Sequence, residues 1–245
     1  MKKLNKELLK SNIEKIAKYD FENNKVFGSA YCVIQGEDEV YKKCFGTLSL
    51  KSTEPVTENT IFRLASMTKP VTAIAILILI ERGLLSLDDK ISEYLPEFKD
   101  VHVTRISESC SLIDSGEAKN EITVCNLLTH TSGMQEGISN CTTAKSKEEV
   151  LDRLYSYDLK YTVAEHIIYS DLNYIMLGEI VETITGKSLD VYAKEVVFDP
   201  LEMYDTGYKP LDKMRCAPTE DRNDETYRGI VRGDVHDETA YACGG

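Results

Sequence analysis

Positive charge is scarce in this chain relative to negative charge. Its 245 residues carry 29 Lys and Arg against 41 Asp and Glu, which gives a formal net charge of −12. Binding to a nucleic-acid backbone requires a basic surface, which this composition does not supply. Polyanionic substrates and anionic membrane surfaces are disfavoured for the same electrostatic reason. The composition therefore argues against all three as partners.

Long apolar runs and paired cysteines are also lacking. The longest apolar stretch, residues 71–80, is much shorter than the roughly 20 residues that a membrane span needs. The first twenty residues have neither a continuous apolar core nor a small-residue cleavage site, so no signal peptide is predicted. The seven cysteines form no CxxC pair and have no zinc-like spacing with the four histidines. We therefore predict free thiols, a cytoplasmic location and no metal or cofactor, and the oligomeric state stays open.

Three common catalytic motifs are absent as well. The chain has no HExxH, GxSxG or GxGxxG, which excludes the usual metalloprotease, α/β-hydrolase and dinucleotide-binding interpretations. The run Thr185-Gly186-Lys187-Ser188 is like the end of a phosphate loop, but Val181 stands where the first glycine is required. A phosphate loop is therefore discarded.

What is present is the composition of a folded globular chain, 42% hydrophobic and 29% charged. A chain of this length can bury a real core without disulfides. Apolar spacing predicts a helix at the start of the chain and a hairpin over residues 28–35 and 40–46. Residues 66–82 are apolar nearly all round, which predicts a helix buried at the centre of the fold and followed by Gly83.

The middle of the chain is predicted to be mostly helical. Ser146 and Glu149 have the spacing of a capping box before a helix. Further helices are expected over residues 172–186 and from Ser188 to just before Pro200. This helical region, about residues 86–204, is predicted to form one lobe.

Strands are expected mainly at the two ends of the chain. Residues 107–120 are polar and predict an exposed loop, and short extended pieces follow Leu201. This order predicts an α/β (α+β) fold, in which an antiparallel sheet is built from residues 1–85 and 205–245 and flanked by helices. The C-terminal strands are too few to complete such a sheet, so we expect some of its strands to be missing.

The strongest candidate for chemistry is Ser66-Met67-Thr68-Lys69, the single S-x-x-K motif of the chain. Helix positions i and i+3 share one face, so Lys69 is placed to reach the Ser66 hydroxyl. A serine hydroxyl needs an adjacent base, and a lysine serves as that base when its pKa is lowered. At the start of a helix, the Ser66 backbone N–H would also point at a developing oxyanion. The alternative is a helix-capping serine beside an exposed lysine, since about one such motif is expected by chance in a chain of this size.

Two further segments are candidates with simple structural alternatives. Tyr169 precedes a predicted helix, and a tyrosine beside a cationic lysine ionises more easily and can move protons. Its alternative is an ordinary aromatic at a helix entrance, with Ser170 or Asp171 as the cap. His130 and Ser132 are two residues apart and would not face each other on a helix, so we predict that His130 ties down a turn.

Four ordered blocks and the tail carry a family resemblance. The blocks are FRLASMTKPVTAIAILILIERGLLSLDDKISEYLPEF, ITVCNLLTHTSGM, IIYSDLNYIMLGEIVETITGKSL and DPLEMYDTGY. In order and spacing the chain resembles the class C β-lactamase-like serine hydrolases, which include penicillin-binding DD-carboxypeptidases and carboxylesterases. The resemblance runs from about Gly28 to the last residue. The tail is most similar to the esterase and penicillin-binding-protein branch.

The resemblance implies a β-lactamase/transpeptidase-like catalytic domain over residues 1–245, with an α/β part, an all-helical part and the site in the cleft between them. It makes Ser66 the acylated nucleophile, Lys69 its proton partner and Tyr169 the second acid/base group. Asp171 occupies a substrate-binding position where many relatives have Asn, which changes the local charge. His130 matches a residue that is structural in the family.

The predicted function is that of a serine hydrolase that forms an acyl-enzyme on Ser66 and cleaves an ester or amide. Small-molecule esters, amides or β-lactams are the expected partners, and the natural substrate stays open. Relatives continue into a third motif, Lys- or His-x-Gly, which this sequence does not reach before Gly245. The domain is therefore expected to be C-terminally incomplete. The alternative function is an inactive fragment or pseudoenzyme that acts as a binding protein, and the role of His236 stays open.

Overall fold

A computed structural model of the chain describes residues 4–23, 25–49, 52–106, 112–117, 121–138, 146–222 and 229–243. The chain forms two compact units, Met1–Arg63 with Pro210–His236 and Leu64–Lys209 with Asp237–Gly245. Helices and antiparallel strands are both present, in agreement with the predicted α/β class. The division at about residues 85 and 205 into an α/β part and a helical lobe stays a prediction of the sequence.

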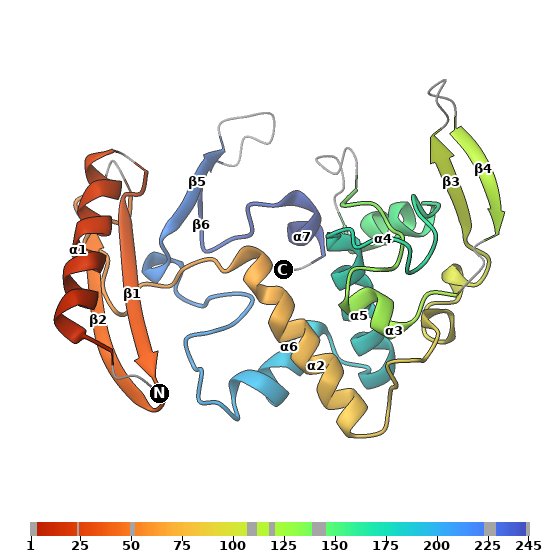
Figure 1. Cartoon of the computed structure of the whole chain (residues 1–245), viewed down its shortest axis with the longest axis horizontal. Coiled ribbons are helices and arrows are strands. Elements are labelled where there is room, and N and C mark those ends of the chain that lie inside the picture. The colour runs from red at the N-terminus through yellow and green to blue at the C-terminus, as the bar shows by residue number, and fades with distance from the viewer. Residues whose placement is uncertain are drawn as a thin grey trace. The chain divides into compact units, whose positions relative to one another are not determined.

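The first unit opens with a helix packed on a hairpin. Helix α1 (Lys6–Glu22) lies along strands β1 (Gly28–Gln35) and β2 (Asp38–Gly46), as Figure 1 shows. The side chain of Asn5 caps the helix by accepting from the Leu8 N–H at 3.0 Å. The two strands pair antiparallel with one register shift after Val33. The predicted N-terminal helix and hairpin are both confirmed.

The same unit receives a second hairpin from the other end of the chain. Strands β5 (Pro218–Arg222) and β6 (Gly229–Arg232) pair antiparallel, after the short 3-10 turn η6 (Lys213–Arg215). Both chain ends therefore contribute strands, as predicted. Within the described residues the two hairpins form separate ladders, and the N- and C-terminal segments meet through a parallel bridge between Ile61 and Cys216.

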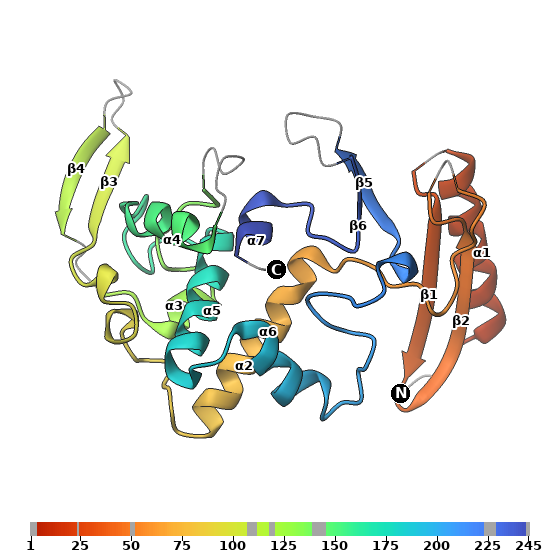
Figure 2. The same cartoon turned by 180° about the vertical axis from the view of Figure 1, so that it is seen from behind.

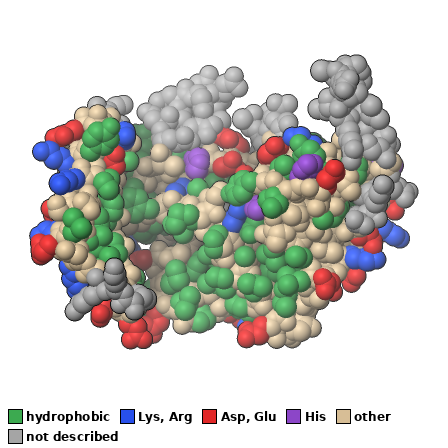
Figure 3. Space-filling model, in the orientation of Figure 1, with side chains coloured by type: hydrophobic (Ala, Val, Ile, Leu, Met, Phe, Trp, Pro, Cys, Tyr) green, Lys and Arg blue, Asp and Glu red, His purple; other side chains and the backbone are tan. Residues whose placement is uncertain are grey.

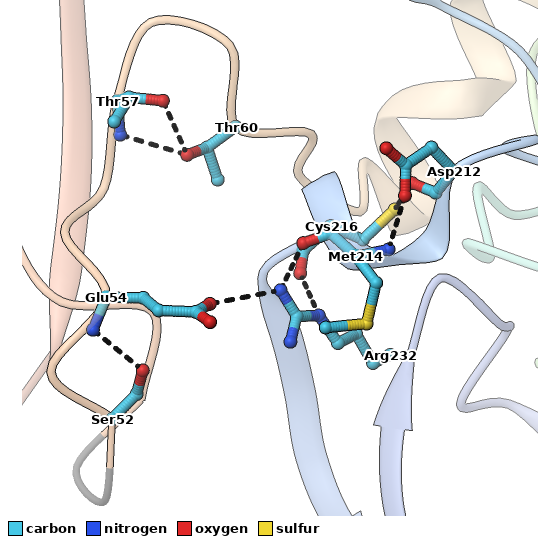
Figure 4. Close-up of polar contacts among 8 residues, drawn as sticks. All are labelled: Ser52, Glu54, Thr57, Thr60, Asp212, Met214, Cys216 and Arg232. Atoms are coloured by element: carbon cyan, nitrogen blue, oxygen red, sulfur yellow. Dashed lines mark hydrogen bonds and ion pairs between the residues drawn. The ribbon is translucent and has the colours of Figure 1, made fainter.

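Arg232 on β6 fastens these segments together (Figure 4). Its Nε donates to the Cys216 carbonyl at 2.8 Å, and its Nη2 donates to the Met214 carbonyl. The Nη2 atom also lies 3.5 Å from the Glu54 carboxylate. One guanidinium thereby satisfies two backbone carbonyls that precede β5, and it pairs with a carboxylate from the N-terminal segment.

The second unit is mainly helical and contains the largest apolar core. Helix α2 (Lys69–Glu81) packs against α5 (Asp171–Thr185) and α6 (Leu189–Ala193), which Figure 2 shows from behind. Its other described helical elements are η1 (Ala65–Thr68), η2 (Ile91–Glu93), η3 (Pro96–Phe98), α3 (Val124–Leu128), α4 (Lys147–Tyr155), the π-helical turn η5 (Lys194–Phe198) and α7 (Glu238–Ala242). Fully buried side chains from several of these elements meet at the core: Ile76, Leu79, Leu127, Met176, Leu177 and Ile180.

The predicted helix ends are confirmed at four places. Gly83 and Gly186 follow α2 and α5 with φ of +69° and +66°, a left-handed conformation that glycine adopts without steric cost. The Ser146 side chain accepts from the Glu149 N–H at the start of α4. Ser188 lies at the N-cap position of α6, and its hydroxyl donates to the Asp190 carboxylate at 2.5 Å.

Three predictions about local structure were wrong. Residues 65–68 form a 3-10 turn, so the α-helix begins at Lys69 and not at Ser66. Helix α2 is buried on one side only, since Leu77 is 50% exposed, and Figure 3 shows hydrophobic side chains on this unit's surface. Residues 112–117 lie in the predicted loop, yet they form strand β4 (Leu112–Glu117) and pair with β3 (His102–Ile106). Residues 107–111 and 118–120 of that loop lie outside the described residues.

The two faces of α2 are expected to differ in their effect on stability. Replacement of the fully buried Leu79 by Ala should lower the free energy of unfolding by about 2–5 kcal/mol, because it leaves a cavity in the core. The Leu77→Ala change on the exposed face should stay within about 0.5 kcal/mol. Urea unfolding followed by circular dichroism checks both values, and equal losses would contradict the one-sided burial of the helix.

Candidate active site

Ser66 and Lys69 lie next to each other at the start of α2. Ser66 is exposed in the 3-10 turn, and Lys69 Nζ donates to Ser66 Oγ at 3.3 Å. Ala65, directly before the serine, has a φ of +47°, which is strained for a residue with a Cβ atom. Pro70 lies in the first turn of the helix, where a missing N–H costs little. The structure thus brings the two S-x-x-K side chains together.

Asp171, which is far from Lys69 in sequence, pairs with the Lys69 ammonium. Its Oδ1 lies 2.5 Å from Lys69 Nζ, a charge-assisted hydrogen bond between the first residues of α5 and α2. The Lys69 side chain is only 14% exposed, whereas the Asp171 side chain is 56% exposed. The ammonium group is therefore held beneath the carboxylate.

Aromatic rings surround the same ammonium group. Lys69 Nζ lies 4.8 Å from the centre of the Tyr169 ring and 5.7 Å from that of Tyr174. The His130 ring is 4.8 Å from the Tyr169 ring and 5.3 Å from the Tyr174 ring. Cation–π contacts of this kind hold an ammonium in place when it is shielded from water. Ser66, Lys69, Tyr169 and Asp171 are thus all brought to one place.

His130 fixes the segment that carries Tyr169 and Asp171. It has a φ of +59° in the turn after α3, and its carbonyl accepts from the Ile168 N–H. Its Nδ1 accepts from the Ser170 N–H at 3.1 Å, and the Asn173 amide lies 3.2 Å from the same atom. The turn-anchoring position that the sequence predicted for His130 is confirmed.

A second layer of buried polar contacts supports this turn. The Ser132 hydroxyl donates to Asn173 Oδ1 at 2.6 Å and accepts from the Met134 N–H. The Ser170 hydroxyl donates to the Gln135 carbonyl at 2.5 Å. Ser132 is buried in this network, which agrees with the structural interpretation of the His130 and Ser132 pair.

The environment shifts two pKa values at the site. Burial tends to lower the pKa of Lys69, but hydrogen bonds to Asp171 and Tyr169 and the Asp171 charge outweigh it, so the pKa is raised. The condition under which a lysine serves as the base, a lowered pKa, is therefore not met in this structure, and Lys69 is an ammonium at neutral pH. Burial, and secondly the Lys69 charge, lower the pKa of His130, while Asp171 opposes them. His130 is therefore uncharged at neutral pH.

Sequence reasoning missed Tyr174 and Asn173. Tyr174 is three residues after Asp171 on α5, so helical spacing would have placed both on the side that faces Lys69. Asn173 is fully buried among apolar neighbours, and a buried amide requires partners. Its position between two apolar helix residues gave no signal of which partners those would be.

No metal site is apparent among the residues that the structure describes. No group of three or more His, Cys, Asp or Glu side chains in those ranges is placed to hold an ion. Cys32, Cys44, Cys125 and Cys216 carry free thiols, and Cys110 and Cys141 lie outside the described residues. Of the helices that are described, none combines the length and apolar composition needed to cross a bilayer.

Solved structures share this fold. A class C β-lactamase superposes with a TM-score of 0.76 at 23% identity, covering all of this chain and 63% of that one. EstCE1, a hydrolase with promiscuous acyltransferase activity, superposes with a TM-score of 0.73 at 21% identity, covering 93% of this chain and 59% of that one. The chain therefore has the β-lactamase/transpeptidase-like fold, as the resemblance implied.

Sequence relatives define the family. The Beta-lactamase family model matches residues 9–243, so the chain belongs to the Beta-lactamase family. A putative D-alanyl-D-alanine carboxypeptidase of Escherichia coli (strain K12) is 31% identical over 243 aligned positions, covering 87% of this chain and 54% of the relative. N-acetylmuramyl-L-alanine amidase of Bacillus subtilis (strain 168) is 33% identical over 222 positions, covering 82% and 48%. The chain thus spans about half the length of these curated relatives.

The lowered pKa of His130 predicts a pH-dependent stability. The folded state resists protonation, so its contribution is complete above the unfolded pKa of about 6.5 and is lost as pH falls below it. In His130→Asn, the loss of unfolding free energy below about pH 6.5 that His130 causes should disappear. Asparagine is a suitable replacement because it tolerates the positive φ at this position. Urea unfolding between pH 8 and 5 measures the unfolding free energy of the wild-type chain and of His130→Asn as a function of pH. Parallel curves for the two proteins would contradict the assignment of a neutral, half-buried His130.

Proposed function

We propose that the chain carries the acylating centre of a serine hydrolase that cleaves an ester or amide through an acyl-enzyme on Ser66. The observation that carries this proposal is the 3.3 Å contact between Lys69 Nζ and Ser66 Oγ, with Tyr169 and Asp171 around the same ammonium. A serine hydroxyl beside a proton-accepting group is the usual arrangement of an activated nucleophile. The role of each residue is part of the proposal.

The reaction begins with attack of Ser66 Oγ on the substrate carbonyl carbon. The hydroxyl proton passes to Lys69 in its neutral amine form, and the Ser66 backbone N–H stabilises the oxyanion. Collapse of the tetrahedral intermediate expels the alcohol or amine, which takes a proton from Lys69 or Tyr169. Water then attacks the acyl carbonyl carbon and gives a proton to the neutral Lys69 amine. The bond from that carbon to Ser66 Oγ breaks, the carboxylic acid leaves, and Lys69 returns the proton to Oγ.

The names of the relatives favour acyl substrates without choosing one. A carboxypeptidase and an amidase cleave amides, and EstCE1 is described as a hydrolase with acyltransferase activity. We propose small-molecule esters or amides as substrates, with β-lactams as acylating ligands. The cytoplasmic location stays a prediction from the N-terminal sequence and the free cysteines.

A second candidate is a binding protein without turnover. The observation that favours it is the raised pKa of Lys69, because an ammonium cannot accept the Ser66 proton. On this alternative the side chains around Ser66 would hold an acyl compound without forming a covalent bond. Covalent labelling separates the two candidates.

Substitution of Ser66 is expected to abolish acylation. Incubation with a penicillin and, separately, with an activated ester should give a mass increase equal to the acyl group in the wild-type chain. Ser66→Ala should give none, because it removes the hydroxyl that is proposed to be acylated and that lies 3.3 Å from Lys69 Nζ. Ser188→Ala, at the N-cap of α6, is the matched control and should label as the wild type does.

Intact-mass spectrometry on folded samples measures this adduct. An adduct that persists in Ser66→Ala would exclude Ser66 as the nucleophile. The lack of any adduct on the folded wild-type chain, together with saturable non-covalent binding, would favour the binding protein.

The pH dependence of acylation should follow the protonation of Lys69. Its raised pKa keeps the neutral amine rare at pH 7, so the rate should rise as pH increases. Asp171→Asn removes a hydrogen bond and a charge that raise this pKa, so the rising limb should move to lower pH. Stopped-flow acylation rates between pH 6 and 10 test this. A limb that stays in place would exclude Lys69 as the titrating base.

A further inference from the structure

The two charged groups near Ser66 differ in how far they are exposed to solvent. Lys69 and Asp171 carry opposite charges 2.5 Å apart, and His130 is neutral at neutral pH, so the groups that contact one another here sum to zero charge. The positive member is largely buried, whereas more than half of the Asp171 side chain is exposed. An approaching molecule therefore meets the carboxylate before it meets the ammonium.

This carboxylate is close enough to the nucleophile to act on a bound substrate. Because 3.3 Å separates Ser66 Oγ from Lys69 Nζ and 2.5 Å separates Nζ from Asp171 Oδ1, the carboxylate oxygen lies within about 5.8 Å of the serine hydroxyl. At such a separation, in a partly shielded site, two charges interact more strongly than they would in bulk water. A charged group near the scissile carbonyl therefore experiences Asp171 directly.

The neighbouring charges do not reverse this effect. Glu136 lies next to Asp171 in the fold, since the Glu136 carbonyl accepts from the Asp171 N–H at 2.9 Å. The side chain of Glu136 pairs with Lys160 at 3.4 Å, so this second pair also has no net charge. Among the described residues, Lys69 is therefore the cation that pairs with Asp171, and the Glu136–Lys160 pair adds no net charge beside it.

We infer that Asp171 is a specificity-determining residue that selects acyl substrates by charge. It favours esters and amides whose acyl group is neutral or cationic near the scissile carbonyl, and it disfavours those with a carboxylate there. This inference rests on the proposed acyl-enzyme at Ser66. It differs from a positioning role, because a residue that only holds Lys69 in place changes the rate for every substrate by the same factor.

Three activated esters of matched chain length distinguish these two roles. One p-nitrophenyl ester carries an unbranched alkanoyl group, the second a terminal carboxylate and the third a terminal trimethylammonium group. The measured quantity is the ratio of kcat/KM for each charged ester to that for the neutral ester. Effects on the base or the nucleophile cancel in this ratio, because all three esters use the same chemistry.

For the wild-type chain the expected order is cationic or neutral above anionic. In Asp171→Asn, the anionic-to-neutral ratio should rise about 10-fold at low salt, and the cationic-to-neutral ratio should fall. Asp171→Glu retains the negative charge and should retain the wild-type order. Both differences should shrink in about 1 M salt, where the screening length is about 3 Å.

Glu195→Gln is the matched control. Glu195 is also an exposed carboxylate paired with a lysine, Lys187, but it lies outside the site. Its removal changes the net charge by the same amount and should leave both ratios unchanged. An equal change in Glu195→Gln and Asp171→Asn would assign the effect to net charge and overturn the inference.

Unchanged ratios in folded Asp171→Asn would also overturn it and would leave Asp171 as a positioning residue of an active hydrolase. Failure of the proposed function gives a different result, namely ester hydrolysis that is the same in Ser66→Ala or absent in the wild type. That result refutes the acyl-enzyme on Ser66 and, with it, the inference. The Ser66→Ala measurement thus tells the two failures apart.

Discussion

The candidate site depends on one ammonium group held out of water. Lys69 Nζ lies 3.3 Å from the Ser66 hydroxyl and 2.5 Å from the Asp171 carboxylate, with the rings of Tyr169 and Tyr174 beside it. A largely buried ammonium is costly unless hydrogen bonds and opposite charge compensate it. The compensating groups come from a segment about a hundred positions away, so the site exists only where α2 and α5 are packed together.

The turn at His130 makes that packing specific. Its backbone carbonyl and its Nδ1 accept from the Ile168 and Ser170 N–H groups, and the Asp171 N–H donates to the Glu136 carbonyl. These bonds fix the backbone on both sides of Tyr169, so its ring is held between the imidazole and the ammonium. A neutral imidazole is required for this, because a protonated Nδ1 cannot accept a hydrogen bond. The motif histidine thus acts on the site through the backbone.

Local sequence signals predicted most elements of the chain. Apolar spacing predicted α1 and α5, and the glycines at 83 and 186 marked the ends of two helices. The same reasoning failed where tertiary contacts decide which residues are buried or which segments pair as strands. The apolar pattern of α2 does not say which side is covered, and the exposed Leu77 shows that one side is not. Strand β4 was predicted as a loop because its polar composition outweighed the pairing with β3 that only the folded chain supplies.

The sequence by itself determined that Ser66 and Lys69 lie together in the candidate site. The S-x-x-K spacing predicted the contact between Ser66 and Lys69, because two positions three apart on a helical turn are neighbours whatever the rest of the chain does. Only the tertiary structure decided the protonation of Lys69. Burial alone would lower its pKa, but hydrogen bonds to Asp171 and Tyr169 and the charge of Asp171 raise it. The distance between two groups far apart in sequence depends on how α2 and α5 pack, and electrostatic energy depends on that distance.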